Sequence, residues 1–215
     1  MAGAGQAPRA GQQGTCGLSP APTEIAIFPL NAVLFPGGLL PLRIFEQRYM
    51  DMAKGCLKDD KPFGVCLIRS GREVGAPATP EPVGCTASII EWDMQQLGVL
   101  SVKALGGQRF RILDSRVTEA GLTRASVEML PQVADTNLAE EFYGCANVLR
   151  AVIREHGPQI MAEPHQFESS SWVSARLTEI LPVPLAAKQR LLELEDAAQR
   201  IEILNKFLLQ HRIAG

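Results

Sequence analysis

The stretch IFPLNAVLFPGGLLPLRIFEQRY, residues 27–49, limits the fold more than any other part of the chain, because prolines interrupt it repeatedly. Phe28, Phe35 and Leu40 each precede a proline, whose ring disfavours the helical backbone conformation in the residue before it. Proline also lacks the N–H that a β-ladder needs, so strands that contain it lie at sheet edges, bulges or corners. The stretch therefore predicts bent β-structure, a curled sheet or small barrel rather than a sandwich.

A tight turn and a helix are predicted in and just after this stretch. Residues 35–38, FPGG, fit a type II turn, in which proline sets the second position and Gly37 accepts the positive φ of the third. Residues 39–43 are then expected to run back as the second strand of a hairpin. From Phe45 onward apolar residues recur at helical spacing, which predicts a helix that ends near residues 59–62.

Short apolar segments separated by turn signals continue up to residue 130. The Gly- and Pro-rich residues 70–82 are expected to form a surface loop, and Gly106-Gly107 a turn between two strands. With an entering strand at residues 24–28, the pattern predicts at least six short strands and one inserted helix, a small mixed barrel. The strands expected after the helix are residues 63–68, 83–92, 99–105, 108–117 and 122–130.

After a polar linker at residues 131–136 the apolar spacing becomes helical. Asn137 with Glu140, and Asp196 with Gln199, are interpreted as capping pairs at helix starts. Each predicted helix carries one apolar stripe, so together the helices should pack as a compact bundle. The predicted helices are residues 137–156, 169–181, 184–192 and 196–208.

These patterns indicate an α+β fold class and divide the chain into three parts. Residues 1–23 are mostly Gly, Ala, Pro and Gln, have no apolar run to bury and are expected to be a disordered tail. Residues 24–130 are expected to form the barrel subdomain, and residues 131–215 an all-helical bundle subdomain.

Composition limits the partners. The net charge of −2 lacks the positive excess that phosphate-backbone binding depends on, so nucleic acid is disfavoured as the main partner. No apolar run approaches the roughly 20 residues that a membrane helix requires, so no membrane partner is expected. The five cysteines are odd in number and scattered without a C-x-x-C pair, which argues against a disulfide framework and favours a cytoplasmic location.

Motifs of common catalytic chemistry are absent from the sequence. The dipeptide Gly-Lys does not occur, which excludes a phosphate loop, and there is no G-x-S-x-G or H-E-x-x-H. His156, His165 and His211 are not paired at ligand spacing, so no metal or other cofactor is expected. Ser169–Ser171 with Lys188 could be imagined as a Ser-Lys dyad, but serines lead at helix N-caps and that role is favoured. No catalytic residue is assigned.

Two further pairs of side chains have competing interpretations. Trp92 and Trp172 could grip a peptide, but the favoured interpretation is that each anchors a core with its N–H at the edge. Arg109 and Arg111 fall on one face of a predicted strand and could form an anion site. A solvated strand face with nearby carboxylates is the favoured interpretation.

Four blocks stand out in order: IFPLNAVLFPGGLLPLRIFEQRY at 27–49, VGCTASI at 83–89, GQRFRI at 107–112 and LPVPLAAKQRLLELEDAAQRIEIL at 181–204. Together they resemble the N-terminal substrate-binding domain of the Lon protease family, in a free-standing form carried by some bacteria. The resemblance covers nearly all of residues 24–210, and its first block is the most specific. It implies a PUA-like β-barrel followed by a helical subdomain, in agreement with the division above.

The resemblance also implies a role. In the full-length family this domain helps to recognise unfolded or tagged proteins and to assemble a ring. The ATPase and Ser-Lys protease domains that follow it in the protease are missing from this sequence, so the resemblance carries over no catalytic residue.

The leading hypothesis is a non-catalytic module that binds unfolded or apolar polypeptide segments. Proline-interrupted strands leave edge groups beside apolar side chains, to which a guest strand can add. The groove between barrel and bundle is a second candidate surface. The competing interpretation is that the same residues build the barrel core and its turn. The candidate binding residues are Phe35, Pro36, Arg43, Phe45, Tyr49 and Arg109.

Two alternatives stay open. An RNA-binding PUA-like module would need a basic face and a salt-dependent affinity. An orphan enzyme that uses the barrel as a scaffold would need a pocket of ionisable groups with shifted pKa values. The expected partners are unfolded or client polypeptides, while cooperation with a separate protease and self-association are left undecided.

Overall fold

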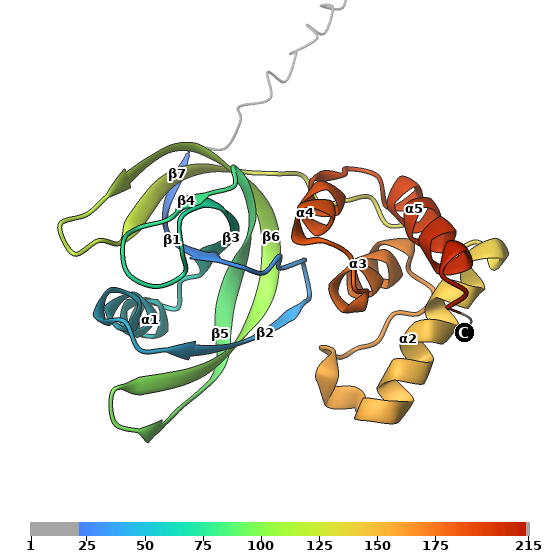
Figure 1. The fold of residues 1–215 in the computed structure, drawn as a ribbon, viewed down its shortest axis with the longest axis horizontal. Helices are drawn as coiled ribbons and strands as arrows, with labels where there is room; N and C mark the ends of the chain where they lie inside the picture. The colour runs from blue at the N-terminus through green and yellow to red at the C-terminus, as the bar shows by residue number, and fades with distance from the viewer. Residues whose placement is uncertain (1–21, 214–215) are drawn as a thin grey trace, which may run out of the picture.

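The computed structural model describes residues 22–213, which form a seven-stranded sheet and a group of helices that follows it (Figure 1). The expected α+β class is confirmed. Most of the predicted tail, residues 1–21, lies outside the described residues. The strands are β1 (Thr23–Leu30), β2 (Leu39–Ile44), β3 (Phe63–Ser70), β4 (Thr79–Pro80), β5 (Val83–Gln96), β6 (Val99–Val117) and β7 (Thr123–Met129). The helices are α1 (Gln47–Asp59), α2 (Tyr143–His156), α3 (Ser170–Ile180), α4 (Leu185–Glu193) and α5 (Ala197–Gln210), with 3-10 turns η1 (Glu140–Phe142) and η2 (Pro158–Ile160).

The strand pairings close on themselves. Along the sheet the order is β1-β7-β6-β5-β3, and β3 then pairs in parallel with β1, while the other pairs in this ring are antiparallel. A closed ring leaves its strands without free edges, and the apolar side chains inside it, among them Ile27, Phe110 and Val127, form a core. Figure 1 shows helices α2–α5 grouped on one side of this sheet and α1 on the side away from them.

The FPGG turn has the predicted type, but the predicted hairpin is wrong. Gly38 N–H donates to the Phe35 carbonyl at 2.9 Å and Gly37 has φ +72°, as a type II turn requires. However, β2 pairs with β6 and not with the chain before the turn. The reason is that the turn is bound to Gly106 of β6. The Gly37 N–H donates to the Gly106 carbonyl, and the Gly106 N–H donates to the Gly38 carbonyl, both at 2.8 Å.

Gly106-Gly107 is not a turn, because β6 continues through both residues. Residues 100–105 pair with β2, whereas residues 110–117 pair with β7, so the two glycines mark the place where β6 changes partner. A Cβ on Gly106 would clash with the Phe35 carbonyl oxygen. Glycine is therefore needed here for close approach of the turn and not for a reversal of the chain.

The helices fall close to their predicted ranges, and two of the expected caps are present. Ser169 accepts a hydrogen bond from Trp172 N–H at 2.9 Å, and Asp196 accepts one from Ala198 N–H at 2.8 Å. Asn137 does not cap a helix, because α2 begins only at Tyr143, after η1. It instead forms a bridge with Ser169, the residue before α3.

The turn also joins the sheet to the helices. Phe35 is fully buried in the core that the helices build. Its N–H donates to Glu179 Oε1 at 3.3 Å, and Arg176 of α3 donates to the Pro36 carbonyl at 2.9 Å. Arg176 and Glu179 are themselves an ion pair at 3.0 Å, with side chains 1 % and 21 % exposed. One turn is thus bound on one side by β6 and on the other by α3.

Replacing Gly106 tests the close approach. Gly106→Ala forces the turn or β6 to shift, so we expect a loss of about 1–3 kcal/mol in the free energy of unfolding. Gly55→Ala in α1 is the control, because its Cβ would meet nothing within 4 Å and alanine favours a helix over glycine by about 1 kcal/mol. Urea unfolding measures both variants. Equal effects of the two substitutions would contradict the close approach.

Glu179 should make stability depend on pH. Burial raises the pKa of this carboxyl from its ordinary 4.5 to about 7, against the opposing effects of Arg176 and the Phe35 N–H. Between these values the folded protein holds a proton that the unfolded chain has released, so stability falls as the pH rises from about 5 to about 7. Glu179→Gln keeps an acceptor for the Phe35 N–H and should remove this slope in urea unfolding at stepped pH. A variant with the wild-type slope would assign the titration to another group.

Candidate functional site

Arg43, Phe45 and Tyr49 lie together in one groove, which we call the β2 groove. It has a volume of about 270 Å³ and runs beside β2 and the start of α1. Phe45 and Val74 are each 56 % exposed, so large apolar side chains are open to solvent here. The apolar residues that line it include Leu30, Leu40, Leu42, Phe45, Tyr49 and Val74.

The inner wall of the β2 groove is rigidly packed. Tyr49 is 5 % exposed and stacks on Phe28, with ring centroids 4.0 Å apart and planes 19° apart. The Arg48 guanidinium lies 4.7 Å from the Tyr49 ring centroid and pairs with Glu46 at 2.9 Å. Burial raises the pKa of Tyr49, so its phenol is neutral at physiological pH. Tyr49 thus supports the groove, whereas Phe45 is the side chain open to a partner.

The outer edge of β2 has no strand beside it among residues 22–213, where β6 is its single partner. The Gly106 N–H bond to the Gly38 carbonyl sets which residues point their backbone groups at β6. Backbone groups alternate along an antiparallel strand, so the N–H and C=O groups of residues 40, 42 and 44 point toward β6. Those of residues 39, 41 and 43 point away from it, toward the free edge. Pro41 therefore costs no ladder bond, and the edge still offers N–H and C=O groups at Leu39 and Arg43.

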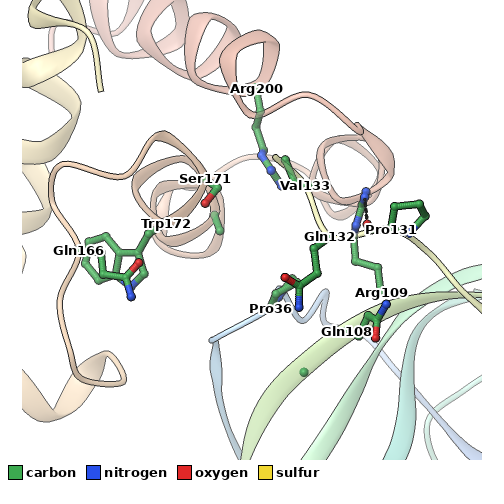
Figure 2. Close-up of a pocket in the computed structure, with 12 residues that line it drawn as sticks. Pro36, Gln108, Arg109, Pro131, Gln132, Val133, Gln166, Ser171, Trp172 and Arg200 are labelled. Atoms are coloured by element: carbon green, nitrogen blue, oxygen red, sulfur yellow. Dashed lines mark hydrogen bonds between the residues drawn. The ribbon is translucent and has the colours of Figure 1, made fainter. Parts of the chain in front are cut away.

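Pro36 and Arg109 line a second hollow, which we call the sheet–helix cleft. It has a volume of about 250 Å³ and lies where the sheet meets the helices. Figure 2 shows Gln108 and Arg109 rising from β6 toward side chains of the linker after the sheet, with Trp172 of α3 and Arg200 of α5 on the helical side. Phe35, the remaining predicted site residue, is buried and lines neither hollow.

The interpretation of Arg109 as part of a solvated strand face is wrong. Its side chain is 3 % exposed and donates to the carbonyls of Leu192 at 2.8 Å, Leu194 at 2.9 Å and Pro131 at 3.2 Å. It therefore ties β6 to the end of α4 and to the linker. Arg111 is exposed as expected. The two differ because the helices cover only the part of β6 that carries Arg109.

The tryptophans also differ from one another. Trp172 is half-buried and packs against Phe167, with ring centroids 5.3 Å apart, so it anchors the helical core as expected. Trp92 is 61 % exposed, and the prediction that it anchors a core is wrong. It lies on β5 opposite Val102 of β6 and lines a shallow, open hollow together with Pro41, Leu42 and Arg43 of β2, so its ring is left at the surface.

The imagined Ser-Lys dyad is not assembled. Lys188 Nζ donates to the Glu179 carbonyl at 2.7 Å, while Ser169 donates to Asp135 at 2.8 Å and caps α3. In the part of the chain that the structure describes, no three His, Cys, Asp or Glu side chains form a group that could hold a metal ion. No helix among these residues is long and apolar enough to cross a membrane.

Arg200 was missed from the sequence, although a signal existed. It falls in the apolar stripe of α5, between the buried positions Ala197, Ile201 and Leu204, and it is 2 % exposed. A charged residue inside an apolar stripe is unusual, because buried arginine requires partners.

Comparison with known proteins connects this architecture to a family. The model of the ATP-dependent protease La (LON) substrate-binding domain matches residues 24–210, nearly the whole described fold. The chain belongs to the Lon substrate-binding domain family. The resemblance of the four sequence blocks is thereby confirmed.

Related proteins agree with the family. The crystal structure of a Lon N-terminal domain protein from Xanthomonas campestris is similar with a TM-score of 0.70 and 32 % identity, over 85 % of this chain and 96 % of that one. Lon protease 2 of Myxococcus xanthus is 28 % identical over 89 % of this chain and 24 % of its own length. Protein cereblon of Gallus gallus is 33 % identical over 50 % of this chain and 24 % of its own. The chain thus spans about a quarter of these two longer relatives.

The two arginines of β6 should differ sharply in their contribution to stability. Arg109→Met removes charge-assisted bonds to three carbonyls and leaves these acceptors buried, so we expect a loss of about 3 kcal/mol in the free energy of unfolding. Arg111→Met, at an exposed position, should change it by less than about 0.5 kcal/mol. Chemical denaturation of both variants measures the difference. Similar small losses would mean that Arg109 does not hold the helices to the sheet.

Proposed function

We propose that this domain is a non-catalytic module that binds extended apolar segments of unfolded or client polypeptides in the β2 groove. The observation that carries the proposal is the coincidence of exposed Phe45 with an unpaired strand edge. A guest strand can hydrogen-bond to the outward groups of β2, while its apolar side chains lie against Phe45 and its neighbours. The description of the matching family as a substrate-binding domain supports this role.

The charges around the β2 groove suit a partner of mixed sequence. Arg43 and Glu73 line it with opposite signs, and Glu46 is already paired with Arg48. Such a rim selects for apolar content and extended shape, and does not demand one net charge. We also propose that the bound polypeptide is the substrate of a protease, since the family domain belongs to an ATP-dependent protease. A cytoplasmic location remains a prediction.

Replacing the exposed side chain of Phe45 tests whether the β2 groove is the binding site. We expect Phe45→Ser to weaken binding of a fluorescently labelled, extended apolar peptide by about tenfold or more, because the partner loses the burial of one aromatic ring. Fluorescence anisotropy measures the affinity, and a reduced and alkylated polypeptide that cannot refold serves as a second ligand. The matched control is Leu209→Ser on α5, another exposed apolar position, at 70 % exposure. Equal affinities of the two variants, or no binding by wild type, would remove the β2 groove as the site.

A further inference from the structure

Three buried arginines meet at the boundary between sheet and helices. Arg109, Arg176 and Arg200 are 3 %, 1 % and 2 % exposed. Arg176 has Glu179 as its ion-pair partner, and Arg109 is bound to three backbone carbonyls. Arg200 has neither kind of compensation. A buried charge is costly unless it is paired, so Arg200 requires an explanation.

The bonds of Arg200 leave most of its donors unused. Its Nε donates to Ser174 Oγ at 3.1 Å, and its guanidinium carbon lies 5.7 Å from the Phe35 ring centroid. Its two terminal nitrogens donate to no acceptor among residues 22–213, and no carboxylate there lies within ion-pair distance. Figure 2 shows the side chain reaching from α5 toward the linker in the sheet–helix cleft, which it lines.

The electrostatics of the cleft favour an anion. Burial, together with the charges of Arg109 and Arg176, lowers the pKa of Arg200 to about 10, so the group is still cationic at neutral pH. Asp196 opposes this shift from a distance but is occupied as the N-cap of α5. The start of α3 supplies no free donor here, because Asp135 already accepts the Ser171 N–H.

We propose that the sheet–helix cleft binds a small organic carboxylate, whose charged end pairs with the terminal nitrogens of Arg200. The volume of about 250 Å³ suits a ligand of modest size. A guanidinium can donate two parallel hydrogen bonds to the two oxygens of a carboxylate. One free guanidinium matches a single negative charge. Pro36, Val133 and Trp172 offer apolar surface to a carbon body. The neutral side chains that also line the cleft, those of Gln108, Gln132, Gln166 and Ser171, add no second positive charge for a phosphate.

This site is separate from the β2 groove and independent of the proposed polypeptide binding. The two hollows share no lining residue. The Phe45→Ser variant should therefore bind carboxylates as wild type does, whether or not it binds peptides.

Paired probes test the inference. We expect the full chain to bind at least one of acetate, benzoate and N-acetyl-L-leucine saturably in calorimetry, and N-acetyl-L-leucine amide at least about tenfold more weakly than the acid. Arg200→Met should weaken binding of the acid by about tenfold or more. Binding of inorganic phosphate more tightly than every carboxylate, or equal binding of acid and amide, would overturn the assignment. So would the absence of binding by all three acids.

A tethered carboxylate provides a test that leaves Arg200 in place. Val133 lines the cleft, is half-buried and lies outside the apolar cores. Val133→Glu should bring a carboxylate to Arg200, raise the melting temperature and abolish probe binding. Val133→Gln, of the same shape without the charge, should do neither. Equal melting temperatures and equal probe binding in the two variants would refute a carboxylate site.

Discussion

The contact between the FPGG turn and Gly106 is the constraint on which the rest of the structure depends. It consists of backbone hydrogen bonds in a place with no room for a Cβ. The same turn places Phe35 in the helical core and binds α3 through Arg176 and Glu179. Because β2 leaves the turn on one side and Pro36 lines the cleft on the other, this contact positions both candidate binding surfaces.

The two surfaces rest on different physics. The β2 groove combines exposed apolar side chains with a strand edge, so its binding would come from apolar burial and backbone hydrogen bonds. The sheet–helix cleft is lined by a cation that lacks a counter-charge, so its binding would come from charge pairing and hydrogen bonds to that cation. The two proposed ligands would therefore not compete, because the hollows share no lining residue.

The candidate site was predicted in part. Arg43, Phe45 and Tyr49 were chosen from the proline-rich stretch and do lie in one groove, since they are near in sequence and share the strand-to-helix junction. The sequence did not show that Phe35 and Arg109 are buried while Phe45 is exposed. Alternation along a strand shows which side chains share a face but not what covers that face. The helices that bury both residues are far away in the sequence.

What the sequence by itself determined was local: the type II turn at FPGG, the caps at Ser169 and Asp196, and the α+β class. These depend on backbone preferences and on hydrogen bonds between residues a few positions apart. Only the tertiary structure decided the partner of β2, the continuity of β6 through Gly106 and the burial of Arg200. Each of these follows from contacts between distant segments, which no local pattern of apolar and polar residues encodes.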